Sequence, residues 1–312
     1  MAPLAPRPGA LTWLGHASAL VELGGMRVLT DPALTRRLAH LRRHHDVDTD
    51  ALGAPDLVLV SHVHMDHLHI PSLRLLGRDV PLLVPAGAAA LLRRRGFRRV
   101  RETSAGATTD VGRLRIETVP AVHSGRRGPH SRVSVDAVGY VLRADEGSVY
   151  FPGDTDLFAE MADLDGIDVA LLPIGGWGRT VGEGHLDPVR AVRATELVQP
   201  RLVVPVHWGT YSPIGPRGGP PPWLRDPVHR FESELARLGA DDRLHLLDPG
   251  GGLVLPTGDQ GWASAPAPVV PGATRGRRAG RARSGPPPND RRGDASCGAS
   301  WSSPSSPRWP SG

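Results

Sequence analysis

The feature that most constrains this chain is the run His62-Val63-His64-Met65-Asp66-His67, which places three imidazoles and one carboxylate within six residues. The run closely follows the apolar segment 57–60. Neutral imidazole and carboxylate are the ligands that zinc, manganese and ferrous iron accept. A histidine-rich surface loop is the alternative, but further histidines and aspartates occur downstream where a metal site needs them. The run therefore predicts a metal site at the end of a buried strand.

The spacing within this run predicts ligands for two neighbouring ions. If the backbone stays extended beyond the strand, His62 and His64 project to the same side. Asp66 and His67 follow where the chain turns toward a predicted helix at 70–76, so they point at an adjacent position. One short loop can thus contribute to two metal sites, and each of them still lacks ligands.

Three later strand ends supply candidates for the missing ligands. They are His123 after the predicted strand 113–122, Asp154 after 149–151, and His207 after 202–206. Open α/β sheets place their sites at the carboxyl ends of strands. Taken alone, each of these residues is more often a core histidine or a turn aspartate. Together with the first run, they are predicted metal ligands.

Apolar segments of strand length alternate with amphipathic ones through most of the chain. The predicted strands are 11–14, 19–23, 26–30, 57–60, 81–84, 113–122, 137–142, 149–151, 169–172 and 202–206, and the predicted helices are 70–76, 86–95, 158–162, 188–198 and 227–238. Gly24-Gly25 fits a hairpin turn, Asp187 and Asp226 are predicted N-caps, and Gly239 is a predicted helix end. This mixture predicts an α/β domain with helices outside two central sheets.

The composition changes near residue 259. Residues 1–258 carry 29 Arg and 29 acidic residues, whereas residues 259–312 carry 8 Arg and 3 Asp, and the chain has no lysine. The net charge of +5 and the pI of about 10.4 therefore come from the second segment, so a basic nucleic-acid face on the first does not follow. Residues 259–312 are rich in Pro, Gly, Ser and Arg, and we expect a disordered tail behind a domain at 1–258.

Cysteine content and hydropathy bear on the compartment. Cys297 is the single cysteine, so no disulfide forms within the chain and no thiolate in residues 1–258 binds a metal. The chain has no run of about 18 apolar residues, and Thr12, His16 and Glu22 interrupt the apolar stretches near its start. We expect a soluble, cytoplasmic protein without a membrane span, and the sequence does not predict its oligomeric state.

The motifs together resemble the metallo-β-lactamase superfamily of metal-dependent hydrolases, over residues 11–255. The resemblance rests on Leu14-Gly15-His16-Ala17-Ser18 with Asp31-Pro32, the run at 62–67, Pro120-Ala121-Val122-His123, Phe151-Pro152-Gly153-Asp154-Thr155, and Val204-Pro205-Val206-His207-Trp208-Gly209-Thr210. Within the superfamily, the chain is most similar to the branch that contains ascorbate-6-phosphate lactonase and the N-acylphosphatidylethanolamine phospholipase D.

The resemblance implies a four-layer αββα sandwich with a dinuclear metal site at one edge. Carried over motif by motif, the first ion is bound by His62, His64 and His123, the second by Asp66, His67 and His207, and both by Asp154. The chemistry agrees with this division, because a carboxylate has two oxygens to share and a neutral imidazole offers one lone pair. Zinc is the expected metal, with manganese or iron as alternatives.

One position departs from the branch's pattern. The branch often has an acidic residue two places after the last histidine of the first run, and this chain has His69 there. A carboxylate at that place would orient a metal ligand by a hydrogen bond. Asp31 is the candidate to replace it.

The resemblance further implies hydrolysis of a small anionic ester, either a lactone or a phosphodiester. Two divalent ions a few ångströms apart lower the pKa of a bridging water and generate a hydroxide near neutral pH. This hydroxide attacks a carbonyl carbon or a phosphorus without a covalent enzyme intermediate. Two alternatives stay open: a nuclease acting on RNA or DNA, and a non-catalytic binding or redox protein on the same fold.

Two residues are candidates for catalysis beside the metals. Asp66 belongs to the ligand run, and His185 precedes the predicted helix 188–198, a setting that favours anions. His185 is a candidate for binding substrate or for donating a proton to the leaving group. A solvated loop histidine is the equal alternative.

Further residues are candidates for contact with the substrate. Arg126 and Arg127 follow His123 closely and are candidates for holding a phosphate or carboxylate, against the alternative of a solvated loop. The remaining candidates are His16 and Trp208 for substrate contact and Trp177 and Tyr211 for pocket lining, although aromatic residues usually serve packing first.

Overall fold

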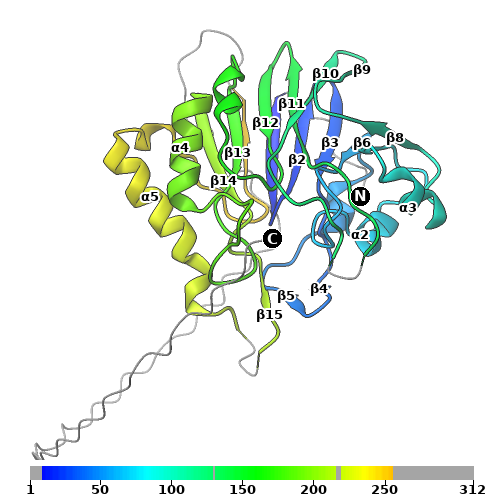
Figure 1. The fold of residues 1–312 in the computed structure, drawn as a ribbon, viewed down its shortest axis with the longest axis horizontal. Helices are drawn as coiled ribbons and strands as arrows, with labels where there is room; N and C mark the ends of the chain where they lie inside the picture. Colours follow the sequence, from blue (N-terminus) through cyan, green and yellow to red (C-terminus); the bar gives the residue numbers. More distant parts are fainter. Residues whose placement is uncertain (1–8, 129–130, 216–218, 256–312) are drawn as a thin grey trace, which may run out of the picture. The chain divides into compact units, whose positions relative to one another are not determined.

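The computed structural model describes residues 9–128, 131–215 and 219–255 (Figure 1). The predicted tail at 259–312 lies outside these residues. Its disorder, and the division of the chain at residue 258, therefore stay predictions.

The first of two large sheets has seven strands. In spatial order they are β16 (Gly252–Val254), β1 (Ala10–Gly15), β2 (Ser18–Leu23), β3 (Met26–Thr30), β6 (Leu57–Leu59), β7 (Leu82–Pro85) and β8 (Val100–Thr103). The turn between β2 and β3 is Gly24-Gly25, with φ values of 60° and 76° that suit glycine. The turn is therefore the predicted one, and the strands β3, β6, β7 and β8 run parallel to one another.

The second sheet has six strands. In spatial order they are β14 (Leu202–Val206), β13 (Val169–Pro173), β12 (Gly147–Phe151), β11 (Val138–Ala144), β10 (Leu114–Pro120) and β9 (Thr108–Val111). Strands β12, β13 and β14 are parallel. Two antiparallel steps lead from β12 through β11 to β10, so β10 runs in the same direction as these three. The carboxyl ends of β10, β12 and β14 therefore meet at one edge.

Helices cover the outer faces of both sheets and complete the predicted αββα sandwich (Figure 1). The helices α2 (Ile70–Leu75) and α3 (Ala89–Arg94) lie beside the first sheet, and α4 (Pro188–Val198) and α5 (Asp226–Leu238) lie beside the second. Leu73 and Leu92 of α2 and α3 share a buried cluster with Val58 of β6. Between the sheets, the hydroxyl of Tyr140 donates a hydrogen bond to the carbonyl of Val60 at 2.8 Å.

A small third sheet lies at the lower edge of Figure 1 and was not predicted. It consists of β15 (Tyr211–Pro213), β5 (Leu41–Arg43) and β4 (Arg37–Leu38) in that order. The remaining elements are the short helix α1 (Thr49–Leu52) and the 3₁₀ turns η1 (Ala159–Asp163), η2 (Pro222–Arg225) and η3 (Asp241–Arg243). Among the described residues, no helix has the length and apolar character to cross a membrane.

Two local predictions were wrong. The segment predicted as an α-helix at 158–162 is the 3₁₀ turn η1, because five residues give too few hydrogen bonds to sustain an isolated α-helix. Asp226 is the first residue of α5 rather than its N-cap, since the preceding η2 runs directly into the helix. Asp187 does cap α4, accepting a hydrogen bond from the Arg190 amide at 2.9 Å. Gly239 ends α5 with φ 73°.

Candidate metal centre

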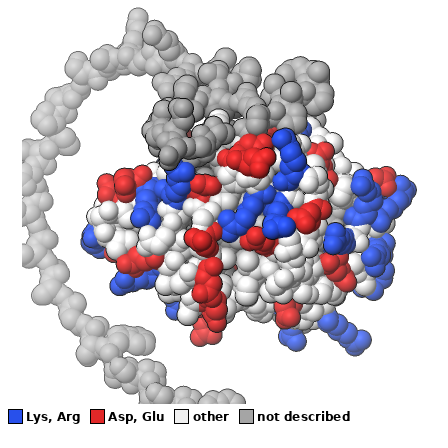
Figure 2. All heavy atoms as spheres, turned by 90° about the horizontal axis from the view of Figure 1, so that it is seen from above, with Lys and Arg blue, Asp and Glu red and all other residues white. Residues whose placement is uncertain are grey.

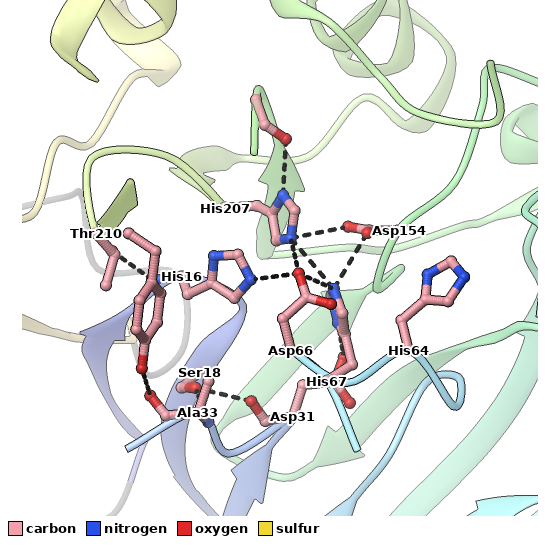
Figure 3. A network of polar contacts seen from close by, with 12 residues as sticks. His16, Ser18, Asp31, Ala33, His64, Asp66, His67, Asp154, His207 and Thr210 are labelled. Carbon is pink, nitrogen blue, oxygen red and sulfur yellow. Dashed lines mark hydrogen bonds and ion pairs between the residues drawn. The ribbon is translucent and has the colours of Figure 1, made fainter. Parts of the chain in front are cut away.

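All seven predicted ligands converge at the edge where strands of both sheets end. Figure 3 shows five of them, His64, Asp66, His67, Asp154 and His207. Their ligand atoms, with those of His16, form two groups in which the atoms lie within 4.8 Å of one another. One group is His62, His64, His123 and Asp154, and the other is His16, Asp66, His67 and His207. The structure therefore brings together residues from loops that follow β1, β6, β10, β12 and β14.

In the first group, three imidazoles turn their nitrogens toward one point. The Nδ1 atom of His64 lies 2.9 Å from Nε2 of His62 and 3.0 Å from Nε2 of His123. Two nitrogens bound to one tetrahedral zinc ion are roughly 3.3 Å apart, given Zn–N bonds near 2.0–2.1 Å. The observed spacing is close to that of a shared ion.

In the second group, Nε2 of His67 and Nε2 of His207 face each other at 3.2 Å. The Oδ2 atom of Asp66 lies 3.8 Å from the first of these nitrogens and 3.9 Å from the second. Nε2 of His16 also contacts this oxygen, at 3.0 Å. The three predicted ligands again surround a common point, and His16 holds the carboxylate from the side.

Asp154 lies between the two groups. Its Oδ2 is 3.1 Å from Nε2 of His67 and 4.0 Å from Nε2 of His62, and its Oδ1 is 3.4 Å from Nε2 of His207. The Oδ1 atom is buried and has no hydrogen-bond partner. A buried carboxylate oxygen without a partner is costly unless a cation compensates it. The donor set, its spacing and this oxygen therefore fit divalent metal ions.

The imidazoles are fixed by the nitrogens that point away from the centre. His62 Nδ1 bonds to Ser61 Oγ at 2.9 Å, His67 Nδ1 to Asp31 Oδ2 at 2.7 Å, His123 Nδ1 to the Gly184 carbonyl at 2.6 Å, and His207 Nδ1 to the Gly175 carbonyl at 2.7 Å. Each of these contacts places the proton on Nδ1 and leaves Nε2 free as a lone-pair donor.

Asp31 supplies the orienting carboxylate that the sequence lacks at position 69. Besides His67, its carboxylate accepts hydrogen bonds from the amide of Ser61 at 2.8 Å and from the hydroxyl of Ser61 at 2.5 Å. His69 instead points its Nδ1 at the hydroxyl of Ser72, 2.8 Å away in α2. The departure at position 69 thus leaves the ligand His67 with a carboxylate partner.

Three residues at the centre have a left-handed backbone. The φ values are 53° for His16, 30° for Asp31 and 63° for His207. Non-glycine residues rarely adopt this conformation, and where they do the surrounding structure holds them. Here the amide of His207 donates to the carbonyl of His16 at 2.9 Å, and the amide of His16 donates to Thr210 Oγ1 at 2.6 Å.

Burial keeps several of the imidazoles in the neutral form that metals accept. It lowers the pKa of His16 to about 3 and that of His123 to about 4. Burial likewise holds the pKa of His62 well below its ordinary value.

At Asp154 and His67, neighbouring charges outweigh the effect of burial on the pKa. Burial of Asp154 opposes its ionisation, but His207 and His67 outweigh this and hold the pKa of Asp154 well below its ordinary value. Burial also opposes protonation of His67, but Asp154, Asp66 and Asp31 raise the pKa of His67 well above its ordinary value. Three carboxylates around one imidazole create the negative potential in which a cation is stable.

Comparison with known proteins agrees with this geometry. Residues 26–208 match the profile described as the beta-lactamase superfamily domain. A UPF0173 metal-dependent hydrolase of Methanopyrus kandleri is 37% identical over 253 residues, which cover 77% of this chain and 97% of that protein. The chain belongs to the β-lactamase superfamily of metal-dependent hydrolases.

A further relative and a solved structure are similar to most of the chain. A UPF0173 metal-dependent hydrolase of Nitratidesulfovibrio vulgaris is 33% identical over 264 residues, covering 81% of this chain and 98% of that protein. Among solved structures, the metallo hydrolase Igni18 of Ignicoccus hospitalis is 26% identical, with a TM-score of 0.61, and covers 79% of this chain and 98% of that one.

His185 of this hydrolase reaches the centre from the loop before α4. Its Nε2 lies 3.5 Å from Oδ2 of Asp154, and its ring packs edge-on against that of His123 at 4.6 Å. The side chain is 25% exposed, whereas His62, His67, Asp154 and His207 are buried. Burial opposes its protonation, but contact with Asp154 outweighs this and raises the pKa of His185. The structure thus places His185 between the metal centre and solvent.

The residues predicted to contact substrate lie in different surroundings. Arg126 is exposed, whereas Nη1 of Arg127 donates to the carbonyls of Val63 and Leu68 at 2.9 and 3.2 Å. Trp208 is buried and stacks on Trp13, and Tyr211 is buried, while Trp177 is 39% exposed and packs edge-on against His40. Substrate contact by His16, Trp208, Arg126 and Arg127 stays a prediction.

Several residues that shape the centre carry no sequence signal. The carbonyls of Gly175 and Gly184 orient two ligands, but every residue has a carbonyl. Ser61 and Thr210 act through hydroxyls that are common throughout the chain. Only their positions beside His62 and His207 mark them.

Proposed function

We propose that this metal-dependent hydrolase holds two divalent ions and cleaves an ester bond in a small anionic molecule. His62, His64 and His123 would hold the first ion, Asp66, His67 and His207 would hold the second, and Asp154 would serve both. The observation that carries the proposal is Asp154. Its Oδ2 lies near Nε2 of His62 in the first group and Nε2 of His67 in the second, and its buried Oδ1 has no hydrogen-bond partner.

A pair of divalent ions lowers the pKa of bound water, supplies a nucleophile near neutral pH and stabilises negative charge on the attacked group. Zinc is the expected metal because imidazole and carboxylate ligands suit it, while manganese and iron accept the same set. The water oxygen forms a bond to the carbonyl carbon or phosphorus, and the ester C–O or P–O bond breaks.

The departing ester oxygen needs a proton, and His185 is placed to donate it. Its Nδ1 is held by the carbonyls of Gly182 and Glu183 at 3.2 and 3.1 Å, which leaves Nε2 directed toward Asp154. It is partly exposed, so it can exchange its proton with solvent between turnovers. In this role His185→Ala lowers kcat more than it raises KM.

A lactone and a phosphodiester are both compatible with this centre. The metal ions would attract a negatively charged substrate, and Arg126 is an exposed cation in the loop that follows His123. If Arg126 anchors the substrate's charged group, Arg126→Ala raises KM for anionic substrates and leaves kcat unchanged.

A nuclease is the alternative within the same chemistry. Residues 1–258 carry no net charge, with 29 arginines and 29 acidic residues, and on the upper face of the molecule, shown in Figure 2, the two kinds are interspersed. Phosphate-driven binding to a polymer needs several cations in a row. A small substrate is therefore the better-supported proposal.

The test is an assay of zinc- and manganese-loaded protein against sugar-phosphate lactones and phosphodiesters. Asp154→Asn is the inactive variant, and Asp156→Asn is the matched control, because Asp156 pairs with Arg190 instead of facing the centre. We expect Asp154→Asn to lose metal and turnover together. The proposal is wrong if Asp154→Asn loses metal but keeps near-normal turnover. Lactone opening alone would identify the substrate class as lactones, and phosphodiester cleavage alone would exclude them.

A further inference from the structure

We propose that a cavity beside the β4–β5 hairpin is a second binding site, which takes the phosphate or carboxylate group of a small molecule. The cavity has a volume of about 460 Å³ and is lined by Arg36, Arg37, Arg42, Arg43, His44 and Pro220. None of these residues is a metal ligand and none is acidic. Small-molecule sites commonly enclose about 300–1,000 Å³, so the size suits a small anion rather than a polymer.

The strand pairing places two of these cations in direct opposition. Arg37 of β4 pairs with Arg42 of β5 across the antiparallel hairpin. Like charges directly opposite each other on neighbouring strands are destabilising. An anion bound between the two guanidinium groups would turn the repulsion into two charge-assisted contacts.

The wall of the cavity is also positive and rigid. Arg43 is 6% exposed and donates to the carbonyls of Ala33 and His45 at 2.6 and 2.7 Å. These neutral acceptors fix the guanidinium but leave its charge in place. Beside it, His44 contacts the hydroxyl of Ser212 at 2.7 Å. Burial lowers the pKa of His44, and the charges of His45 and Arg42 lower it further.

Arg36 of this cluster pairs with Asp46. Asp46 lies 3.2 Å from Arg36, with side chains that are 78% and 83% exposed. Exposed ion pairs of this kind contribute little to the stability of the fold. This solvent-exposed pair therefore does little to neutralise the charge of Arg36 toward an incoming anion.

The cavity adjoins the metal centre through Arg43. The guanidinium lies 3.4 Å from the hydroxyl of Tyr211, and the Tyr211 ring packs edge-on against His16. The bound anion is thus either the charged end of the hydrolase's own substrate or a separate small anion. The first possibility rests on the proposed function, whereas binding itself does not.

The experiment is a titration of the full-length protein with inorganic phosphate, followed by calorimetry. Arg37→Gln removes one of the opposed cations, and Arg98→Gln removes the same charge from an exposed pair with Asp79. Asp154→Asn separates binding at the cavity from binding at the metals. We expect saturable binding by wild type, Arg98→Gln and Asp154→Asn, and binding weakened roughly tenfold in Arg37→Gln, as for loss of one charge-assisted hydrogen bond.

A second measurement checks that Arg37→Gln is folded and that the repulsion is real. In phosphate-free buffer of low ionic strength, its melting temperature should equal or exceed that of wild type. If Arg37 instead stabilises the fold, the melting temperature of Arg37→Gln should be lower than that of wild type. The proposal is overturned if wild type shows no saturable binding or if Arg37→Gln binds like wild type. Binding that is lost in Asp154→Asn and kept in Arg37→Gln would assign the phosphate to the metals instead.

Kinetics then distinguish the two sources of the anion. If the cavity holds the substrate's charged end, Arg37→Gln raises KM for an anionic substrate and leaves KM for its neutral analogue unchanged. If it holds a separate anion, neither KM changes without phosphate. Because phosphate binding is measured without turnover, an inactive protein leaves the titration fully interpretable.

Discussion

At the scale of single residues, the centre depends on the hydrogen bonds behind its ligands as much as on the ligands. Four imidazoles present Nε2 to the centre because Nδ1 is bonded elsewhere. Asp31 is the one carboxylate among these partners, and it also bonds to Ser61 twice. It therefore ties the end of β6 to the ligand His67.

Replacing Asp31 with Asn keeps its volume and removes its charge. We expect metal affinity to fall about 10- to 100-fold, the usual cost of losing a partner that orients a ligand. Competition with a chromophoric chelator measures it. Asp79→Asn, at an exposed ion pair with Arg98, is the control and should bind metal as wild type does. Equal affinities in the two variants would show that Asp31 does not support His67.

Arg127 fixes the ligand run from the other side. Its two carbonyl acceptors, on Val63 and Leu68, bracket residues 64–67. In Arg127→Met the apolar length is kept and both hydrogen bonds are lost, at a cost of about 1.5–3 kcal/mol. We expect this cost to be shared between unfolding free energy and metal affinity, measured by urea denaturation and chelator competition. Arg126→Met, in the same loop, should leave both unchanged. The proposed role of Arg127 is wrong if Arg127→Met and Arg126→Met have the same metal affinity.

That the candidate ligands gather in one cluster could be predicted from the sequence, because imidazole and carboxylate have few other uses in such a dense run. His62, His64 and Asp66 therefore stand out without a structure. The position of Arg127 could not be predicted, because its partners are main-chain carbonyls. Neither could the orientation of Trp208, since the same residue fits a pocket or a core.

At the scale of elements, two aspartates that the sequence predicts as helix caps have different roles, because only Asp187 caps its helix. Asp187 accepts a hydrogen bond from the Arg190 amide, so Asp187→Ala should destabilise the protein by about 1 kcal/mol in urea denaturation. Asp226→Ala is the matched comparison. It should cost less, because Asp226 lies inside α5 and contributes only its charge near the helix start. Equal losses would mean that the cap of α4 contributes nothing specific.

The large strands could be predicted from their apolar runs, but the β4–β5 hairpin could not. Its residues 37–43 include three arginines, which give no strand pattern. The hairpin forms because Leu38 and Leu41 bury against Tyr211, which lies far away in the sequence. Long-range burial of this kind overrides local preference.

At the scale of the molecule, residues 1–258 and 259–312 differ in charge. Because the arginine excess lies in the second segment, we expect a chain ending at residue 258 to keep its metal content. Any RNA binding by the full chain should weaken on truncation, with a flatter salt dependence, in fluorescence anisotropy at several salt concentrations. If truncation leaves the salt dependence of RNA binding unchanged, residues 1–258 bind the nucleic acid, and this result would favour the nuclease alternative.

The metal centre exists only while both sheets are folded, because its predicted ligands lie on loops of each sheet. Metal that binds the folded chain and not the unfolded one stabilises it, by about 2.7 kcal/mol at free metal 100 times the dissociation constant. Removing metal also leaves Asp154 and Asp66, which both lie near Nε2 of His67, without the divalent charge that would offset them. Dialysis against a chelator should therefore lower the melting temperature, and added zinc should restore it. In Asp154→Asn the chelator should cause a smaller drop. If wild type and Asp154→Asn shift equally, metal at this centre does not stabilise the fold.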